Sequence, residues 1–286
     1  MTTSALLGLP APAKLNLFLH VTGRREDGKH LLESIFELID LHDTIDLYSL
    51  DQDIVERTGD VIGSIEADLC MRAARLIKDL YGIHQGVRIH VTKRIPAGAG
   101  MGGGSSDAAT TLIGLNRLFK LNLSRTQLMQ LGEQLGADVP FFIFGQTGFV
   151  EGIGEQITPI EIPSARYSII WPGIGISTAH IFNDPHLTRN TKSIKIFVFS
   201  GAVRKAWPEL IGHNDLQAVA TRLEPRLKTS LEMLATCNSA RMTGSGSAVF
   251  GLIPESTKYQ LPDLPEQWIG FTVKSLSKHP LYQWLK

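Results

Sequence analysis

Five glycines fall within eleven residues in the stretch Pro96-Ala97-Gly98-Ala99-Gly100-Met101-Gly102-Gly103-Gly104-Ser105-Ser106. Because glycine has no Cβ, the backbone here can adopt left-handed angles and turn successive N–H groups toward one point. An apolar run with helical spacing follows directly over residues 107–118. A helix that starts there adds unpaired N–H groups and the positive end of its dipole. Loop and helix together predict a phosphate site, and hence a nucleotide or another phosphorylated ligand.

Other glycine-rich phosphate loops fit this stretch less well. A P-loop needs a lysine after its last glycine, and none follows here. Gly98, Gly100 and Gly103 match the dinucleotide pattern G-x-G-x-x-G, but residues 87–92 alternate between apolar and polar side chains and no acidic residue stands about twenty positions on. The downstream motifs of protein kinases are missing from the sequence. A flexible linker is the remaining alternative, although linkers rarely separate a strand from an apolar helix.

The composition is balanced, with 28 basic and 28 acidic residues in a chain of 286. This balance gives no support for a nucleic-acid partner, and the length suits one large domain or two ordinary ones. The two cysteines, Cys70 and Cys237, form neither a disulfide framework nor a metal-binding pattern. We find no signal peptide and no apolar run long enough to cross a bilayer. The composition therefore predicts a soluble, cytoplasmic protein with no membrane partner.

Hydrophobic periodicity predicts a mixed α+β chain. Helices are expected over residues 68–81 with a stop at Gly82, from the glycine loop to about residue 120, and from a capping box at Ser124 and Gln127 to Gly136. Later helical residues are expected within 215–234. Strands are expected over residues 14–21, 44–48, 87–92, 141–144, 148–151, 168–171 and 248–253. A turn-rich boundary at residues 152–159 predicts two α+β domains, 1–155 and 156–286.

Three further segments could carry chemistry. Lys14 stands next to Asn16 in an apolar strand, where a lysine is more often a solvated side chain. Asp138 follows a predicted helix, in a turn where an aspartate most often makes a local Asx hydrogen bond. Residues 243–247, Thr-Gly-Ser-Gly-Ser, precede a strand and by themselves favour a simple hairpin turn. Taken singly, none of the three segments establishes a function.

Taken together, these segments resemble one family. In chain order they read Pro-Ala-Lys-Leu-Asn-Leu at 12–17, the glycine-serine loop at 96–106, Gly-Ala-Asp-Val-Pro at 136–140 and Thr-Gly-Ser-Gly-Ser at 243–247. The chain is similar to the small-molecule kinase superfamily that includes galactose, homoserine and mevalonate kinases, the GHMP kinases. The resemblance implies an α+β, two-domain GHMP-kinase fold with the active site between the domains. The N-terminal domain would be of the ribosomal-protein-S5-domain-2-like type, and the C-terminal domain would be ferredoxin-like.

Within the superfamily, residues 23–28, 71–76, 151–155 and 181–185 most resemble the kinases that act on a methylerythritol linked to cytidine diphosphate. This closer resemblance implies transfer of phosphate from ATP to the 2-hydroxyl of that acceptor, in the non-mevalonate route to isoprenoid precursors. Asp138 matches the general base of the family, and Lys14 matches the cation beside it. The second glycine segment, Gly244, Ser245 and Gly246, would support the phosphate site from the other domain. Mg²⁺ is expected on the phosphates, with no protein ligand assigned. The implied ATP-binding residues are Pro96, Ala97, Gly98, Ala99, Gly100, Met101, Gly102, Gly103, Gly104, Ser105 and Ser106.

The residues that match the acceptor site include one departure from the family pattern. The matching residues are Asn16, Lys29, His30, Thr178 and Phe182. The family usually has Gly-Tyr-His where this chain has Gly-Lys-His at 28–30, and that tyrosine stacks on the cytosine. A lysine offers only its ammonium or its methylene stem to a base, so we expect weaker cytidine binding. Asp68 also stands where an asparagine is expected near the adenine pocket.

Two alternatives stay open at this point. One is a sister kinase of the superfamily that acts on a different alcohol, against which His30 and the segment 181–185 argue, because mevalonate and homoserine carry no base. The other is a nucleotide-binding homologue that has lost its chemistry, against which Lys14 and Asp138 argue. A monomer or a weak dimer is expected, with a small-molecule substrate and ATP as partners.

Overall fold

The computed structural model of the chain describes residues 4–194, 209–254 and 258–285. The strands are β1 (Ala5–Arg24), β2 (His30–Leu50), β3 (Val55–Gly59), β4 (Gly86–Thr92), β5 (Gly148–Glu151), β6 (Gln156–Pro159), β7 (Arg166–Trp171), β8 (Asn238–Met242), β9 (Val249–Leu252) and β10 (Ile269–Leu276). The α-helices are α1 (Leu69–Tyr81), α2 (Gly103–Leu118), α3 (Arg125–Glu133), α4 (Val139–Phe144), α5 (Thr178–Asn183), α7 (Asp215–Leu223) and α8 (Arg226–Met233). Two 3₁₀ turns are η1 (Ile65–Ala67) and η2 (Tyr282–Trp284).

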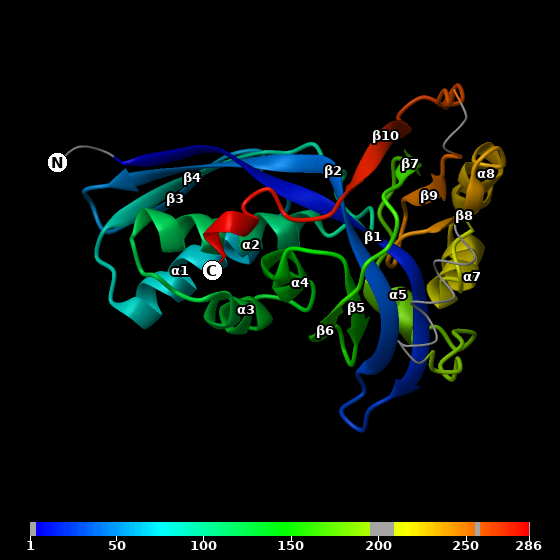
Figure 1. The fold of residues 1–286 in the computed structure, drawn as a ribbon, viewed down its shortest axis with the longest axis horizontal. Coiled ribbons are helices and arrows are strands. Elements are labelled where there is room, and N and C mark those ends of the chain that lie inside the picture. Colours follow the sequence, from blue (N-terminus) through cyan, green and yellow to red (C-terminus); the bar gives the residue numbers. More distant parts are fainter. Residues whose placement is uncertain (1–3, 195–208, 255–257, 286) are drawn as a thin grey trace.

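One sheet connects both halves of the chain, with strand β2 near its middle (Figure 1). The main path runs β3-β4-β2-β10-β7-β9-β8, and β1 and β5 also pair with β2. Strands β1 and β2 span 20 and 21 residues, far longer than a usual strand, and they curve from one half of the molecule into the other. These two strands therefore fix how the two halves face each other.

Strand β1 begins earlier than the sequence predicts. The expected strand over 14–21 is present, but pairing with β2 already starts at Ala5 and continues through Pro10 and Pro12. A proline has no N–H to donate, so it is tolerated where a strand is at an edge or bulged. The register indeed shifts between Pro12 and Lys14. At that bulge the Lys14 N–H turns outward and donates to the carbonyl of Met101 at 3.0 Å. The glycine-rich loop thus closes this part of the edge of β1.

Helices α1 to α4 cover one face of the sheet in the N-terminal half (Figure 1). Helix α2 packs tightly on the sheet, and its Gly114 lies so close that a Cβ there would come within 2.5 Å of the Leu47 side chain. The helix predicted before Gly82 and the capping box at Ser124 are both confirmed. The helix after Ser124 ends at Glu133, three residues before the expected stop at Gly136.

The strand predicted over residues 141–144 is wrong, because this segment is helix α4. A short continuous apolar run fits a buried strand and a buried helix equally well by periodicity alone. Pro140 sits in the first turn of α4, where its missing N–H costs nothing, and Gly145 ends the helix in a left-handed conformation. Val139 and Phe141 are fully buried in the core of the N-terminal half.

Strands β7 to β10 and helices α5, α7 and α8 form the C-terminal half. The helical stretch predicted over 215–234 is two helices, because Pro225 interrupts it and Glu224 before the proline is extended. β10 pairs with both β7 and β2, so the sheet continues from one half into the other. The boundary at residues 155 and 156 stays a prediction.

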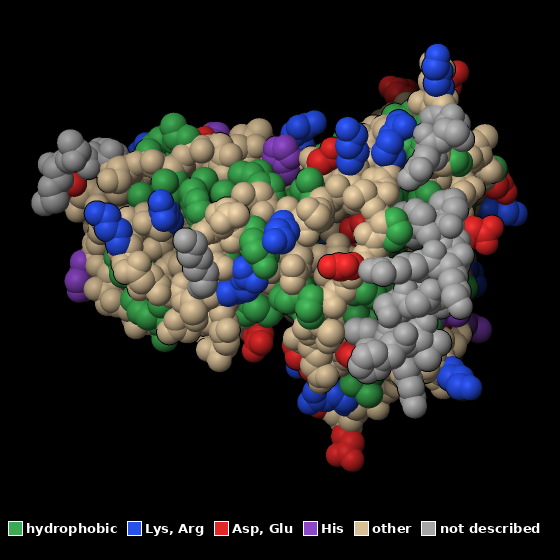
Figure 2. Space-filling view, viewed as in Figure 1, with side chains coloured by type: hydrophobic (Ala, Val, Ile, Leu, Met, Phe, Trp, Pro, Cys, Tyr) green, Lys and Arg blue, Asp and Glu red, His purple; other side chains and the backbone are tan. Residues whose placement is uncertain are grey.

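On the face drawn in Figure 2, the Lys and Arg side chains of the part of the chain that the structure describes are scattered over both halves and form no patch of one charge. Among the described residues, no helix is both long and apolar enough to cross a bilayer.

Candidate active site

The glycine-rich loop connects β4 to α2 through three left-handed residues. The φ angles of Gly98, Gly100 and Gly102 are +66°, +76° and +72°, values that residues with a Cβ rarely adopt. Gly102 is the N-cap of α2 and offers no side-chain hydrogen bond to the first N–H groups of the helix. Those groups, and the positive end of the helix dipole, are therefore available to an anion held by the loop.

A second glycine loop, residues 243–247 between β8 and β9, packs against the first loop through backbone atoms. The Ser247 N–H donates to the carbonyl of Gly98 at 3.1 Å, and the Ala248 N–H donates to the carbonyl of Ala99, also at 3.1 Å. A Cβ on Gly100 would lie 2.3 Å from the carbonyl oxygen of Thr243. This close approach brings a hairpin turn of the C-terminal half next to the candidate phosphate loop.

Both loops open onto a cleft of about 510 Å³. The cleft brings together most of the residues that the sequence nominated, namely Lys14, Asn16, Asp138, Thr178, Phe182 and residues 96–105 and 244–246. Ser106 is buried behind the loop, and its hydroxyl donates to the carbonyl of Pro12 at 2.6 Å. Lys29 and His30 lie outside the cleft lining.

Lys14 and Asp138 form an ion pair on the floor of the cleft. The Lys14 Nζ lies 3.6 Å from Oδ2 of Asp138, with the lysine side chain 3% exposed and the aspartate side chain 32% exposed. Burial lowers the pKa of Lys14, and the charge of Asp138 opposes that shift. The ammonium also donates to Oδ1 of Asn16 and lies 4.5 Å from the centre of the Phe36 ring. A half-exposed carboxylate beside a buried cation is an arrangement that can accept a proton from a bound hydroxyl.

Of the residues predicted to bind the acceptor, some line the cleft and others lie outside its lining. Phe182 in α5 lines the cleft, and its ring centre is 4.8 Å from that of His30, with an angle of 32° between the ring planes. The Thr178 hydroxyl lies 2.7 Å from that of Ser245 and so links α5 to the second glycine loop. Lys29 is exposed in the turn before β2.

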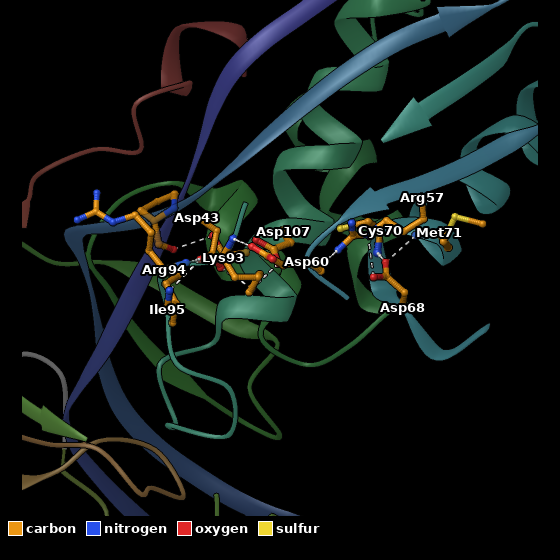
Figure 3. Close-up of polar contacts among 12 residues, drawn as sticks. Asp43, Arg57, Asp60, Asp68, Cys70, Met71, Lys93, Arg94, Ile95 and Asp107 are labelled. Carbon is orange, nitrogen blue, oxygen red and sulfur yellow. Dashed lines mark hydrogen bonds and ion pairs between the residues drawn. The ribbon is translucent and has the colours of Figure 1, made fainter. Parts of the chain in front are cut away.

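An ionic cluster behind the glycine-rich loop was not found by sequence reasoning (Figure 3). Lys93 contacts the carboxylate of Asp43 and also Oδ2 of Asp107, the latter at 2.6 Å. Asp43 accepts further hydrogen bonds from the N–H groups of Arg94 and Ile95, at 2.5 and 2.8 Å. The cluster therefore ties the start of the loop to β2 on one side and to α2 on the other.

Like Lys93, Asp107 of this cluster also lines the cleft. Burial raises its pKa to about 7, opposed by the charge of Lys93 and reinforced by that of Asp43. Oδ1 of Asp107 is buried and has no hydrogen-bond partner among the described residues.

Asp68, the second departure from the family pattern, caps helix α1 (Figure 3). Its Oδ1 accepts the N–H groups of Cys70 and Met71 at 2.8 and 3.1 Å, and its Oδ2 accepts from Nε of Arg57 at 3.0 Å. Asp68 and Arg57 both line the cleft. Because both carboxylate oxygens are engaged within the chain, Asp68 serves here as a helix cap and as the partner of a buried arginine.

A divalent cation would find no cage of side chains in the described part of the chain, where no three His, Cys, Asp or Glu residues gather to hold a metal ion. Of the carboxylates in the cleft, Asp138 contacts Lys14 and Asp107 contacts Lys93. Mg²⁺ commonly completes its coordination with nucleotide phosphates and water. The residues present therefore fit an ion that arrives on a nucleotide, and they do not provide a metal site of their own.

Comparisons with known proteins agree with this geometry. The GHMP kinases N terminal domain matches residues 68–146, and the GHMP kinases C terminal domain matches residues 203–263. The crystal structure of a 4-(cytidine 5'-diphospho)-2C-methyl-D-erythritol kinase has a TM-score of 0.77 and 31% identity, covering 95% of this chain and 99% of that one. A homoserine kinase from Cytophaga hutchinsonii has a TM-score of 0.69 at 16% identity, covering 98% and 96%, which shows a shared fold. The two-domain α+β fold of the GHMP kinases is thus confirmed.

Two relatives of high sequence identity narrow the assignment from the GHMP kinases to one family within them. A 4-diphosphocytidyl-2-C-methyl-D-erythritol kinase of Polynucleobacter necessarius subsp. necessarius is 48% identical, over 96% of this chain and 95% of the relative. Another of that name, from Janthinobacterium sp., is 47% identical over 98% of both chains. The chain belongs to the family of 4-diphosphocytidyl-2-C-methyl-D-erythritol kinases. The resemblance seen in the four motifs is confirmed.

Proposed function

We propose that this chain transfers the γ-phosphoryl group of ATP to the 2-hydroxyl of 4-diphosphocytidyl-2-C-methyl-D-erythritol, a step toward isoprenoid precursors. The observation that carries the proposal is the Lys14–Asp138 pair in the cleft onto which both glycine loops open. The chain is also 48% identical to a kinase named for that acceptor, which supports this choice of substrate.

Asp138 acts as the general base in this proposal. A neutral alcohol is a poor nucleophile, so the reaction gains when a carboxylate accepts the hydroxyl proton as the oxygen attacks the γ-phosphorus. The bond from the γ-phosphorus to its bridging oxygen breaks, and ADP leaves with the electron pair of that bond. The 32% exposure of the Asp138 side chain leaves the carboxylate open to a substrate in the cleft.

Lys14 holds the base in place. Its Nζ lies 3.6 Å from Oδ2 of Asp138, and the ammonium is itself fixed by burial and by its bond to Asn16. The lysine also brings a positive charge next to the phosphoryl group in transfer, where negative charge must be stabilised.

The two glycine loops hold the ATP phosphates in this proposal. The left-handed glycines and the uncapped first turn of α2 offer N–H groups, and residues 244–246 support the site from the other half. Mg²⁺ supplies charge neutralisation when it is bound to the phosphates. We assign it no protein ligand. The cytoplasmic location and the monomeric or weakly dimeric state also stay predictions from the sequence.

Release of ADP by the purified protein with Mg·ATP tests the function. Three acceptors are compared, 4-diphosphocytidyl-2-C-methyl-D-erythritol, mevalonate and homoserine. We expect release with the cytidyl acceptor alone. Release with mevalonate or homoserine instead would assign the chain a sister activity, and release with none of the three would contradict a catalytic role.

A further inference from the structure

Arg189 connects His30, which lies just outside the cleft lining, with Phe182, which lines the cleft. Its Nε donates to Nε2 of His30 at 3.0 Å, across 159 positions of chain. One terminal nitrogen of the same guanidinium donates to the carbonyls of Phe182 and Asp184, both at 2.8 Å, and the other donates to the carbonyl of Leu187 at 3.1 Å. A single planar side chain therefore fixes His30, at the start of β2, relative to Phe182 in α5.

The bond from Arg189 determines which nitrogen of His30 carries the proton. A guanidinium has only donors, so Nε2 of His30 must accept through its lone pair. A neutral imidazole whose Nε2 accepts carries its hydrogen on Nδ1. The neutral form is favoured because burial, the charge of Arg189 and the charge of Arg24 all lower the pKa of His30. Within the described residues, Nδ1 has no hydrogen-bond partner, so its N–H is free for a ligand.

The rings of His30 and Phe182 define where a base can lie. Their centres are 4.8 Å apart, which is too close for a third ring between them. A base bound through the Nδ1–H of His30 therefore lies beside the imidazole and not between the two rings. The pair thus offers one N–H donor and one aromatic face at the rim of the cleft.

We propose that Arg189 is a positioning residue that makes the acceptor site selective for cytosine over uracil. N3 of cytosine is a hydrogen-bond acceptor, whereas N3 of uracil carries a hydrogen. An imidazole held with its hydrogen on Nδ1 donates to the first and clashes with the second. Without Arg189, His30 is free to place its hydrogen on Nε2, and Nδ1 then accepts from uracil. This inference rests on the proposed function, since it assigns the base end of the same substrate.

The test compares cytidine diphosphate and uridine diphosphate as inhibitors that compete with the acceptor, at saturating Mg·ATP. We expect the wild-type enzyme to prefer cytidine diphosphate, and Arg189→Met to reduce that preference about five- to tenfold, the span of one net hydrogen bond. In Arg189→Met, kcat at saturating acceptor and the KM for ATP should stay within about twofold of the wild-type values, because the substitution does not touch the phosphate loops. Arg189→Lys keeps a donor and a charge, and should retain part of the preference.

Arg24→Met is the matched control. Arg24 contributes charge near His30, but its Nε donates to the carbonyl of Gly28 at 3.0 Å and not to the imidazole. We expect its loss to leave the preference for cytidine diphosphate unchanged. An Arg189→Met enzyme with the wild-type ratio of the two inhibition constants would overturn the proposal, and so would a wild-type enzyme without a preference.

A measurement on the wild-type protein covers the case in which Arg189→Met does not fold. The ¹⁵N chemical shifts of the His30 ring distinguish the two tautomers, and we expect the hydrogen on Nδ1. A hydrogen on Nε2 contradicts the proposed role of Arg189. If ADP is released only with an acceptor that carries no nucleobase, such as mevalonate or homoserine, the proposed function and this inference fail together. A working cytidyl kinase with an unchanged inhibitor ratio refutes the role of Arg189 alone.

Discussion

The backbone N–H of Asn16 donates to the hydroxyl of Thr243 at 2.9 Å, across 227 positions of chain. The side chain of the same asparagine accepts from the Lys14 ammonium and donates to the Ser34 hydroxyl at 3.0 Å. Asn16 therefore joins the lysine of the candidate catalytic pair to the second glycine loop. Through this residue, the two halves of the cleft are held in one arrangement.

Asn16→Ala should lower kcat about tenfold and change the KM for ATP little. The substitution removes the neutral acceptor from a buried ammonium, and an unsatisfied buried donor costs about 1–3 kcal/mol. Lys14 then loses its fixed position beside Asp138. Steady-state kinetics at saturating acceptor measure the effect. Ser34→Ala is the control, because it removes a partner of the asparagine and leaves the lysine contact, so its loss in kcat should be smaller. Equal activities of Asn16→Ala and wild type would contradict this role.

Asp138→Asn should reduce kcat by roughly two orders of magnitude or more, the span of general acid–base help. The amide keeps the shape of the side chain, but it accepts no proton at neutral pH. We expect the variant to stay folded and to keep its affinity for ATP, because the Asp138 side chain makes no helix-capping hydrogen bond. The melting temperature should fall modestly, because the amide leaves the buried Lys14 ammonium without its opposite charge. A variant within a few-fold of wild type would show that another group accepts the proton.

Gly100→Ala should weaken ATP binding and lower the melting temperature. The added Cβ would lie 2.3 Å from the carbonyl of Thr243, and the φ of +76° strains any residue with a side chain. The two glycine loops must then separate. Gly8→Ala is the matched control, since Gly8 has a similar φ of +68° but lies outside the cleft lining, and a Cβ there meets no atom of the described residues within 4 Å. Calorimetric titration with ATP should distinguish the variants, and equal affinities would contradict the close packing of the loops.

Lys29→Tyr should lower the KM for the cytidyl acceptor. Lys29 is exposed at the turn before His30, and an aromatic ring at that position would offer the base a stacking face. Such stacking is worth about 1 kcal/mol, so we expect a several-fold effect. The measurement is the KM for 4-diphosphocytidyl-2-C-methyl-D-erythritol at saturating ATP, with kcat as the internal control. An unchanged or raised KM would mean that the lysine does not weaken base binding.

Local signals in the sequence predicted much of the fold and the cleft. Glycines between an alternating strand and an apolar helix predicted the phosphate loop, and three of them have the left-handed angles that only glycine adopts freely. The helix expected over residues 68–81 and its stop at Gly82 were equally local signals, and helix α1 spans Leu69–Tyr81. The pairing of Lys14 with Asp138 is different, because the resemblance to a family suggested it and no pattern within either segment did.

The features that sequence reasoning missed depend on contacts between distant segments. Lys93 and Asp43 are 50 positions apart, and Arg189 and His30 are 159 apart, so no periodicity links the members of either pair. Helix α4 was mistaken for a strand because burial on all sides removes the alternation that distinguishes the two structures. Tertiary packing decides such segments, and it is not visible in a window of a few residues.

Glu37 should make the stability of the fold depend on pH. Its carboxyl is buried where β2 meets the strands of the C-terminal half, and burial raises its pKa from 4.5 to about 8, against the effect of hydrogen bonds from Tyr167 and Ser275. Between those pH values the unfolded chain releases this proton and the folded chain keeps it. The free energy of unfolding therefore falls as the pH rises through the window, by at most about 1.4 kcal/mol for each pH unit.

Glu37→Gln should remove this dependence. The amide oxygen can still accept from the Tyr167 hydroxyl, which lies 2.5 Å from Oε2 of the glutamate, but it carries no titrating group. Urea denaturation at pH 5, 6.5 and 8 should show the variant gaining stability relative to wild type as the pH rises. Tyr167→Phe removes a donor that favours the carboxylate, so it should extend the window to higher pH. Parallel stability curves for wild type and Glu37→Gln would mean that the buried carboxyl does not titrate in this range.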